Sequence, residues 1–454
     1  MLEIGKKYEC KIVDIGQGGV GIGKYEGFTV FIDGALLGEI VDVKITKSKK
    51  KYAEGVISKI KKASEYRVER VCPMKYRNCG GCQIQELDYK KQLEIKTNQV
   101  KEDIKRIAGL EDIEIKDTIG MEKPFRYRNK AQFPVKMIDG KLKIGFYKKK
   151  SHDVIDIEKC VIQHEKNDEI IEIIREYIIK NDVSVYDEKT HKGGIRHIVT
   201  KVGYATDEVM VVLVSTTEKL PGTEALVEEL KSKIDGFKTF VININKEKTN
   251  VVLGRKNINI YGDGKITDYI GKLKFEISPL SFFQVNPIQT EVLYNKALEF
   301  ADIKEGDKVF DIYCGIGTIS LFLAQKAEKV YGVEIVPEAI DDANKNARLN
   351  NMDNLEFFVG KAEEVVPEIY KKGKRANIVV VDPPRKGCDE KVLDTIVGMK
   401  PERIVYVSCN PSTLARDLKY LDERGYQCQI VQPVDMFPHS IHVECIALIQ
   451  RVKS

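Results

Sequence analysis

From Asp307 to the end of the chain, short apolar segments alternate with amphipathic ones, and this alternation restricts the possible fold more than any other feature. The apolar segments are KVFDIYC, KVYGVEI, LEFFVG, ANIVVVD, RIVYVSC, CQIVQPVDMF and HVECIALIQRV; the helical ones include TISLFLAQKA, PEAIDDANKNARLN and STLARDLKYLDERG. Strands that alternate with helices form a doubly wound, mostly parallel sheet, whose ligands bind beyond the carboxyl ends of the strands. The sequence therefore predicts an α/β domain over residues 276–454 with its site at that edge.

Two further regions precede this domain, as the length of 454 residues allows. Residues 1–60 contain four short alternating segments, YECKIVDI, FTVFIDG, EIVDVKIT and YAEGVIS, separated by glycines and charged turns. That pattern is typical of a small antiparallel β-barrel. Residues 61–275 mix strands such as EVMVVLVS with a helix near DEIIEIIREYIIK, and we expect a central α+β domain there.

Residues 88–110 have the periodicity of one amphipathic helix. Leu93, Val100, Ile104 and Ile107 recur at helical spacing, with Lys, Glu and Asp on the other faces. We expect these four side chains to form the packing face of the helix.

The net charge of +5 is small for this length, but its distribution is uneven. Between Val41 and Arg70 there are ten Lys or Arg against four Asp or Glu, including the run KSKKK. Such a run is either a solvated loop or a contact to RNA phosphates. No segment approaches the roughly 18 uninterrupted apolar residues of a membrane span, and the first residues lack the layout of a signal peptide. We therefore expect a cytoplasmic protein without membrane contacts.

The segment VFDIYCGIGTISLFLA has the features of a nucleoside pocket. A strand ends at Asp311, and Gly315 and Gly317 make the turn into a helix, where a ligand can approach the backbone. Ser320 stands where a dinucleotide loop has its third glycine, so no pyrophosphate site is evident. Glu334, 23 residues after Asp311 at the end of the next strand, can accept hydrogen bonds from both ribose hydroxyls. The pattern favours S-adenosylmethionine; the alternative is an ordinary strand–turn–helix with an exposed Glu.

Two more candidate residues follow later strands of the predicted sheet. Asp382 precedes two prolines in VVVDPPRKG, which hold its carboxylate rigidly at a strand end, an arrangement that also suits methyltransferases acting on exocyclic amines. Cys409 ends the next strand; Asn410-Pro411 interrupts it, and Ser412 can cap the helix that follows. The alternative for Cys409 is a buried cysteine that fills a corner of the core.

A thiolate beside a methyl donor suits one reaction in particular, methylation of carbon 5 of a pyrimidine. Addition of the thiolate to carbon 6 makes carbon 5 nucleophilic, and a base must later remove the carbon 5 proton. A nucleophilic Cys409 needs positive potential nearby, for which Arg385 is a candidate. For the base, we expect Glu444 rather than His439 or His442, because a Glu is seldom buried without a partner.

Five segments, SFFQVN, DIYCGIGTISL, DPPRKG, SCNPSTLARD and FPHSIHVE, resemble the RNA (uracil-5-)-methyltransferase family and occur in the family's order. The resemblance implies a class I, Rossmann-like methyltransferase domain. It implies that S-adenosylmethionine contacts Gln284, Tyr313, Glu334 and Asp382, with Thr318 as a further neighbour. It also implies that Cys409 is the nucleophile, Glu444 the general base, and Phe282 the aromatic residue that stacks near a flipped-out base.

The resemblance extends to the amino-terminal half of the chain. Residues 1–60 resemble the RNA-binding TRAM barrel, an OB-like fold, and YRNKAQFPV and GFYKKKSHDVIDIEKCVIQ resemble the family's central domain. In that family the helix at 88–110 packs on the catalytic domain. The implied substrate is a uridine in 23S rRNA rather than tRNA. We expect a monomer, because action as a single chain is the default where the sequence gives no sign of an oligomer. The alternatives are an enzyme that methylates amines and an RNA-binding or folding factor without enzymatic activity.

Four of the ten cysteines are spaced as metal ligands are. Cys72, Cys79 and Cys82 are followed much later by Cys160. Cytosolic thiols stay reduced, and three clustered thiols with one distant thiol can hold a zinc ion or a [4Fe-4S] cluster. The resemblance favours the [4Fe-4S] cluster, because the ribosomal RNA members have this arrangement, and implies a structural or RNA-facing role for it.

Overall fold

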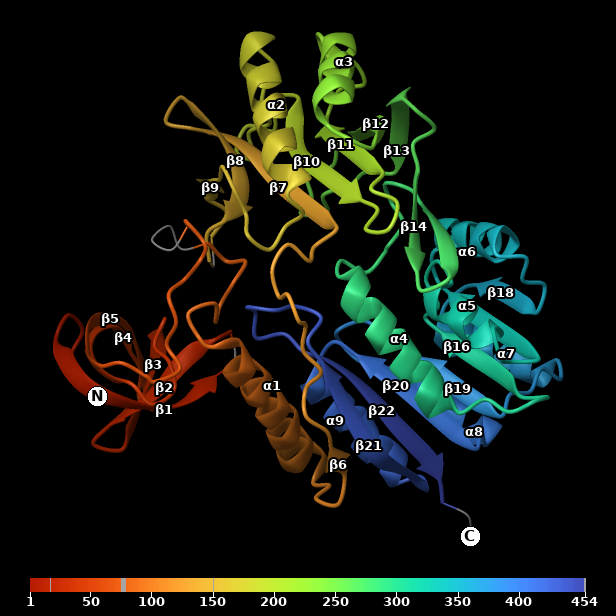
Figure 1. Cartoon of the computed structure of the whole chain (residues 1–454). Helices are drawn as coiled ribbons and strands as arrows, with labels where there is room; N and C mark the ends of the chain where they lie inside the picture. The colour runs from red at the N-terminus through yellow and green to blue at the C-terminus, as the bar shows by residue number, and fades with distance from the viewer. Residues whose placement is uncertain (17, 75–78, 150, 453–454) are drawn as a thin grey trace.

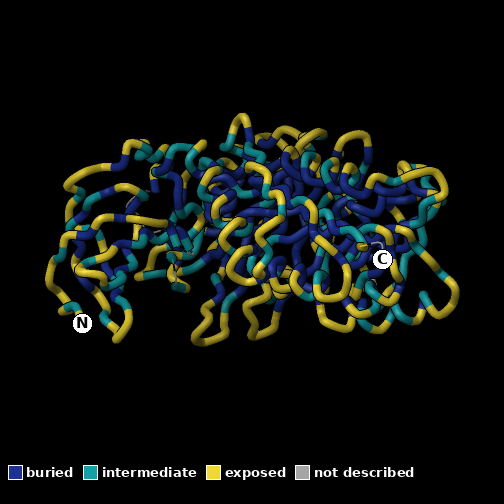
Figure 2. Tube along the Cα trace, turned by 90° about the horizontal axis from the view of Figure 1, so that it is seen from below, coloured by how far each residue is buried: buried dark blue, intermediate teal, exposed yellow. Residues whose placement is uncertain are grey.

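The computed structural model describes residues 1–16, 18–74, 79–149 and 151–452. It contains a small barrel, a central domain with its own sheet, and a larger domain around a second sheet, drawn at lower left, top and lower right of Figure 1. Figure 2 shows buried segments running through the body of the molecule, with exposed turns around its outline. Within the described ranges, no helix is long and apolar enough to cross a membrane.

The amino-terminal barrel has five strands, one more than the alternating segments predict. The strands are β1 (Lys7–Gly16), β2 (Val20–Tyr25), β3 (Phe28–Asp33), β4 (Ile40–Ser48) and β5 (Tyr52–Lys62). They close in the order β1-β2-β3-β5-β4. The pairs are antiparallel except β3 with β5, which run parallel, so the expectation of an antiparallel barrel is wrong for that pair. The additional strand is β2, in which a Cβ at Gly21 would come within 2.7 Å of the carbonyl oxygen of Ala35. This approach requires glycine, and glycine obscures the strand pattern of β2 in the sequence.

After the barrel, helix α1 (Tyr89–Asp103) continues into a π-helix, η1 (Ile104–Ala108). Both contact α9 (Pro411–Asp422) of the larger domain. A π-turn contains more residues than an α-turn and therefore shifts the faces of the helix. As a result Ala108 is buried and Ile107 is 39% exposed. The expectation that Ile107 belongs to the packing face is wrong.

A buried ion pair attaches α1 to the larger domain. The Lys96 ammonium lies 2.5 Å from the Asp435 carboxylate, and both side chains are fully buried. The hydroxyl of Tyr89 donates to the same carboxylate at 2.8 Å. Downstream of η1, strand β6 (Glu114–Ile115) joins the edge of the larger sheet beside β21 (Tyr426–Val434).

The central domain is a seven-stranded sheet in the order β13-β12-β11-β10-β7-β8-β9. Helices α2 (Lys166–Lys180) and α3 (Thr223–Lys233) lie side by side at the top of Figure 1, and both contribute buried residues to the core of this domain. The strands are β7 (Lys130–Ile138), β8 (Lys141–Tyr147), β9 (Val154–Asp156), β10 (Ile195–Val202), β11 (Val209–Ser215), β12 (Phe237–Ile244) and β13 (Lys256–Tyr261). A separate hairpin, β14 (Ile266–Ile270) and β15 (Leu273–Ile277), leads to the larger domain.

The larger domain confirms the predicted α/β class, because its sheet has the order β18-β17-β16-β19-β20-β22-β21-β6 and is parallel from β18 to β20. Its remaining strands are β16 (Lys308–Ile312), β17 (Lys329–Glu334), β18 (Leu355–Val359), β19 (Ile378–Val381), β20 (Arg403–Ser408) and β22 (Glu444–Arg451). Its remaining helices are α4 (Pro287–Ala301), α5 (Thr318–Ala324), α6 (Pro337–Leu349), α7 (Ala362–Lys371) and α8 (Glu390–Met399).

Successive residues of the parallel strands belong to two different cores. Val309 and Val405 pack with α4 and α5 in one core, and Phe310 and Tyr406 pack with α7, α8 and α9 in the other. Because alternate side chains of a strand point to opposite faces, the sheet is covered on both sides. Its edges, where the strands end, are left for ligands.

Candidate functional site

Four of the predicted site residues lie where parallel strands end. Glu334 is the last residue of β17, Tyr313 directly follows β16, Asp382 follows β19, and Cys409 follows β20. These strands are neighbours in the order β17-β16-β19-β20, so their carboxyl ends form one continuous edge. We refer to it as the carboxyl edge.

Glu444 reaches the same edge from the opposite direction. It is the first residue of β22, which runs antiparallel to β20. Ser408 pairs with Cys445 in that register, so the next position along places Glu444 beside Cys409. The charge of Glu444 also contributes to the pKa of the thiol.

The Cys409 thiol is half-buried at the start of α9. Burial, followed by the charges of Glu444 and Asp382, raises its pKa to about 11, while Arg385 lowers it. Arg385 therefore lowers the pKa of the thiol, as expected, but burial and the two carboxyl groups raise it by more. Asn410 caps the helix by accepting from the backbone N–H of Ser412, so the expectation that Ser412 is the cap is wrong. Asparagine is an equally good cap and comes two residues earlier.

Glu444 is a buried carboxyl group with a strongly perturbed pKa. Burial and the neighbouring charge of Asp382 raise its pKa to about 8, and Arg385 opposes them. Burial and the charge of Asp311 likewise raise the pKa of Asp382 to about 7. A general base is most effective when its pKa lies near the working pH, so this environment suits Glu444 for proton removal.

The two histidines of the same segment have other surroundings. His439 stacks on Phe125 at 4.4 Å between ring centroids, and its Nδ1 lies 3.3 Å from the amide nitrogen of Gln92. Burial lowers the pKa of His439 to about 4. Burial, followed by Arg385, lowers the pKa of His442. Neither environment makes the imidazole a stronger base.

Three acidic and hydroxyl groups surround the glycine turn after β16. The Glu334 carboxylate accepts from the backbone N–H of Gly315 at 3.2 Å and of Val336 at 3.0 Å. The Asp311 carboxylate accepts from the Ser320 hydroxyl at 2.5 Å, and burial raises its pKa to about 7. Its Oδ1 is buried without a hydrogen-bond partner among the described residues. An unpaired buried acceptor beside a glycine turn fits a site for a polar ligand.

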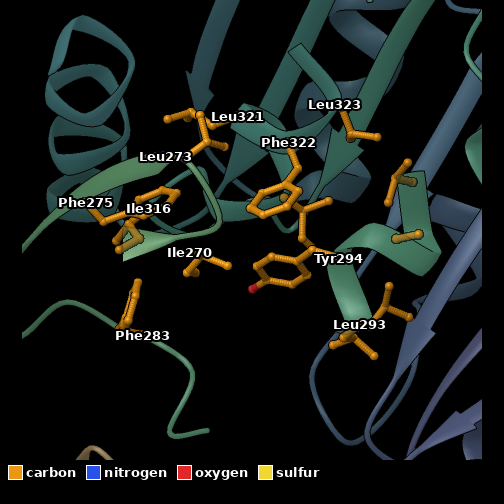
Figure 3. Close-up of a cluster of buried hydrophobic side chains, with 14 of the residues drawn as sticks. Ile270, Leu273, Phe275, Phe283, Leu293, Tyr294, Ile316, Leu321, Phe322 and Leu323 are labelled. Carbon is orange, nitrogen blue, oxygen red and sulfur yellow. The ribbon is translucent and has the colours of Figure 1, made fainter. Parts of the chain in front are cut away.

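Thr318 begins α5, and its hydroxyl lies 3.0 Å from the hydroxyl of Tyr294 on α4. The Tyr294 ring packs edge-on against Phe322, and its oxygen points out of the apolar cluster (Figure 3). Burial, together with the charges of Asp382, Asp311 and Glu444, raises the pKa of this phenol. Tyr294 therefore lies among the acidic groups of the carboxyl edge, a position that the sequence pattern did not reveal.

The segment SFFQVN forms the loop before α4. Phe282 is 66% exposed, whereas Phe283 is buried against Phe275 with 5.9 Å between ring centroids (Figure 3). Gln284 is half-buried, and its backbone carbonyl accepts from the side-chain amide of Asn129 at 3.1 Å. Asn286 ends the loop by capping α4. The loop thus exposes one aromatic ring while its neighbour anchors it.

The four spaced cysteines line one cavity of about 200 Å³ in the central domain. Cys72, Cys79, Cys82 and Cys160 share its wall with Arg70, Arg128 and Lys159. Burial raises the pKa of Cys160 to about 11 and also raises those of Cys79 and Cys82. Residues 75–78, between the first two cysteines, lie outside the described part of the chain.

Two observations concern what this cavity can hold. No group of three or more His, Cys, Asp or Glu among the described residues is arranged to hold a metal ion. The thiols of an iron–sulfur cluster bind its different iron atoms and stand farther apart than the ligands of one ion. Arg70 Nε and Arg128 Nε are buried without hydrogen-bond partners in the same described set. Unpaired cationic donors beside four thiols fit an anionic group such as a cluster with four thiolate ligands.

Sequence reasoning missed Asp311, Tyr294, Arg70 and Arg128 as members of these two sites. For Asp311 a signal was present, because an acidic residue at a strand end directly before a glycine turn lies at the ligand edge. The others come from segments whose proximity only the fold creates.

Comparison with known proteins gives concordant matches. The family model described as tRNA (Uracil-5-)-methyltransferase matches residues 88–452, and the TRAM domain model matches residues 2–57. An uncharacterized RNA methyltransferase of Clostridium tetani is 54% identical over 97% of this chain and 95% of its own length. One from Caldanaerobacter subterraneus is 50% identical over 99% of both. The structure of Pyrococcus abyssi tRNA (uracil-54, C5)-methyltransferase with S-adenosyl-L-homocysteine matches with TM-score 0.78 and 31% identity over 97% and 99% of the two chains.

Proposed function

The chain belongs to the tRNA (uracil-5-)-methyltransferase family and has a TRAM domain, and from this premise we propose that it methylates carbon 5 of a specific uridine in structured RNA through a covalent cysteine adduct. The observation that supports the covalent route is the register of β20 and β22, which brings Cys409 next to Glu444. The proposed methyl donor is S-adenosylmethionine, because the similar Pyrococcus abyssi methyltransferase was solved with S-adenosyl-L-homocysteine, the compound that S-adenosylmethionine becomes when it gives up its methyl group.

The residues around the glycine turn fit that methyl donor. When bound, S-adenosylmethionine supplies an electrophilic methyl group on a sulfonium sulfur. The proposed contacts are Gln284, Tyr313, Thr318, Glu334 and Asp382. Glu334 keeps lone pairs for ribose hydroxyls while it accepts two backbone N–H groups, because a carboxylate has about four acceptor positions.

In the proposed reaction the deprotonated sulfur of Cys409 forms a bond to carbon 6 of the uracil. The electrons of the carbon 5–carbon 6 double bond move toward the carbonyl at carbon 4. From this enolate carbon 5 would take the methyl group, while the carbon–sulfur bond of the donor breaks and the sulfonium sulfur keeps the electron pair, leaving as S-adenosylhomocysteine. Glu444 removes the remaining proton from carbon 5. The double bond re-forms, the bond from sulfur to carbon 6 breaks, and Cys409 is released as a thiolate.

Phe282 is proposed to hold the target base. It is exposed on a loop whose next residue is anchored in the core, so its ring is available as a flat partner. A flipped-out base needs such a partner to replace its lost stacking. On this proposal Phe282, Gln284, Cys409 and Glu444 converge on one pocket.

The proposed substrate is 23S rRNA, and the proposed enzyme acts as a monomer in the cytoplasm. The basic stretch of the barrel supports RNA binding, since Lys49, Lys50 and Lys51 lie at the turn between β4 and β5. A second candidate substrate is tRNA, because the Pyrococcus abyssi protein with the same overall fold acts on uracil 54 of tRNA. Methylation of purified 23S rRNA and of total tRNA, with digestion to locate 5-methyluridine, separates the two.

The cysteine cavity is proposed to hold a [4Fe-4S] cluster that is structural or faces the RNA. Its thiols, together with the Nε atoms of Arg70 and Arg128, which are buried without hydrogen-bond partners among the described residues, are the supporting observation. Reconstituted Cys79→Ser protein is expected to lose the brown absorbance of the wild type. Soluble Cys79→Ser protein that keeps this absorbance would contradict the assignment of Cys79 as a ligand.

The experiment that tests the reaction is trapping with RNA that contains 5-fluorouridine. Fluorine at carbon 5 cannot be removed as a proton, so the wild-type protein and S-adenosylmethionine should form a covalent complex that survives denaturing electrophoresis. Absence of any complex with rRNA and tRNA would overturn the covalent route. Unchanged turnover after replacement of Cys409 would instead support methylation of an amine through Asp382.

A further inference from the structure

Lys201 is a buried lysine of the central domain. The hydrogen bonds of its side chain go to residues at the start of the larger domain. Lys201 lies near the end of β10, is 4% exposed, and forms no ion pair within the described part of the chain. Its ammonium donates to the backbone carbonyls of Ser278 at 2.6 Å and Ser281 at 2.8 Å. Burial lowers its pKa well below the usual value. A buried amine is expensive unless hydrogen-bonded, so these two carbonyls account for its place in the fold.

The two carbonyls belong to the turn that begins the SFFQVN loop. The backbone N–H of Ser278 donates to the Ser281 hydroxyl at 2.9 Å, and the N–H of Ser281 donates to the Ser278 hydroxyl at 3.2 Å. The Ser281 hydroxyl also donates to Asp342 on α6 at 2.8 Å. The turn is therefore held from the central domain by Lys201 and from the larger domain by Asp342.

Two further hydrogen bonds from the central domain hold the other side of Phe282. Asn129, directly before β7, donates from its side chain to the carbonyl of Gln284 at 3.1 Å and from its backbone to that of Val285 at 2.9 Å. Lys201 pairs with Lys130 in the β7–β10 register, so both donors come from adjacent positions of one sheet. Phe282 lies between the two attachment points and is exposed.

We propose that Lys201 and Asn129 are positioning residues by which the central domain sets the place of Phe282 and Gln284 at the carboxyl edge. This inference rests on the proposed function for the roles of Phe282 and Gln284. On this inference, residues of two domains together position the site for the target base. An apolar residue at position 201 would fill the same space without the cost of desolvation but would remove the hydrogen bonds that join the turn to the central domain.

Arg196 offers a matched control on the same strand. It is 6% exposed, and its guanidinium donates to the carbonyls of Asn245, Glu247 and Thr249, away from the SFFQVN loop. Lys201→Met and Arg196→Met each remove a buried cation that binds backbone carbonyls of a loop. A purely structural role for Lys201 predicts similar behaviour of the two variants at equal loss of thermal stability.

The chain has no tryptophan, so Phe282→Trp gives a single fluorescent reporter on the loop. In the reporter protein, Lys201→Met should lower the steady-state anisotropy of Trp fluorescence and increase its quenching by acrylamide. Arg196→Met should change neither. An unchanged reporter in the Lys201→Met protein would overturn the proposal, whether or not the protein methylates RNA. If Lys201→Met does not fold, Asn129→Ala takes its place, because it removes only the side-chain bond.

Activity supplies the second readout, in the protein with Phe282 intact. The rate of covalent trapping at saturating 5-fluorouridine RNA should fall by about 10²-fold in Lys201→Met, since misplacement by about 1 Å has effects of that size. In a background in which both Phe282 and Gln284 are replaced by Ala, the same substitution should cost little more, because Lys201 acts through these two residues. Equal losses in both backgrounds would contradict this. Failure of the wild-type protein to trap RNA concerns the proposed function alone, and the fluorescent reporter then decides on Lys201.

Discussion

Replacing Glu444 by Gln separates the effect of this carboxyl group on stability from its proposed chemical role. Burial and the charge of Asp382 raise its pKa from 4.5 to about 8. Between these two values the unfolded chain has released the proton while the folded chain still holds it, so stability falls as the pH rises. At about 1.4 kcal/mol per pH unit, the loss reaches roughly 5 kcal/mol above pH 8. Because Gln is neutral at every pH, the variant should escape this loss.

Thermal unfolding of wild type and Glu444→Gln at pH 5 and pH 8.5 measures the difference. At pH 5 the two midpoints should nearly coincide. At pH 8.5 the variant should be higher by on the order of 10 °C, since 1 kcal/mol shifts the midpoint of a domain of this size by about 2–4 °C. Glu305→Gln, at an exposed position of the same domain, is the control. Its unfolding midpoint should differ from that of the wild type by the same small amount at both pH values. A Glu444→Gln midpoint that differs equally at both would refute the reasoning about burial.

The same variant tests the assignment of the base. On the proposed route Glu444→Gln still allows Cys409 to add to carbon 6, but the carbon 5 proton has no acceptor. The variant should therefore accumulate a covalent complex with ordinary uridine RNA, visible on a denaturing gel, and form little 5-methyluridine. Wild-type turnover by this variant would exclude Glu444 as the base.

Three further predictions concern single groups. Cys409→Ala should abolish trapping by 5-fluorouridine RNA and leave the calorimetric affinity for S-adenosylhomocysteine within about twofold; an adduct with this variant would exclude Cys409 as nucleophile. The wild-type kcat/KM should rise about tenfold per pH unit from pH 6 to 8, because only the ionised thiol of Cys409, whose pKa burial raises to about 11, adds to carbon 6; a flat profile over this range would contradict this. Lys96→Met should lower the free energy of unfolding, measured by thermal unfolding, by about 3–5 kcal/mol, because it leaves the Asp435 carboxylate buried without the ammonium. Adding Asp435→Asn should restore much of this stability. A double variant no more stable than Lys96→Met would argue against the ion pair.

The fold of the carboxy-terminal half was predictable because its signals are local. Each strand and helix there has its own period and ends at glycine, proline or a polar residue, so elements could be located one at a time. The parallel order alone predicts that the strands share one carboxyl edge, and with it the place of Glu334, Asp382 and Cys409 at that edge. Strand β2 could not be predicted in this way. Its glycines are required by close packing, as at Gly21 against Ala35, and glycine has a low strand propensity.

Features that depend on distant contacts could not be predicted in the same way. In the sequence, the apolar residues of the helix continue at regular spacing through Ile107. The π-turn of η1 nevertheless exposes Ile107 and buries Ala108 instead. Lys201 is one of 74 Lys or Arg residues, and nothing nearby in the sequence distinguishes it as buried. Its partners lie 77 and 80 residues away. Only the docking of two sheets creates that contact.

The cysteine cavity and the proposed base are connected through the backbone. Directly after Cys82, the N–H groups of Gln83 and Ile84 donate to the carbonyl of His439 at 3.0 and 3.1 Å. The loop that contains His439 leads within five residues to Glu444, whose strand holds it beside Cys409. The proposed cluster would thus stabilise the segment against which this loop rests, although none of its ligands lies at the carboxyl edge. On the proposed function, the cluster has no chemical role in methyl transfer. Through this connection it would still affect the position of Glu444, the proposed general base.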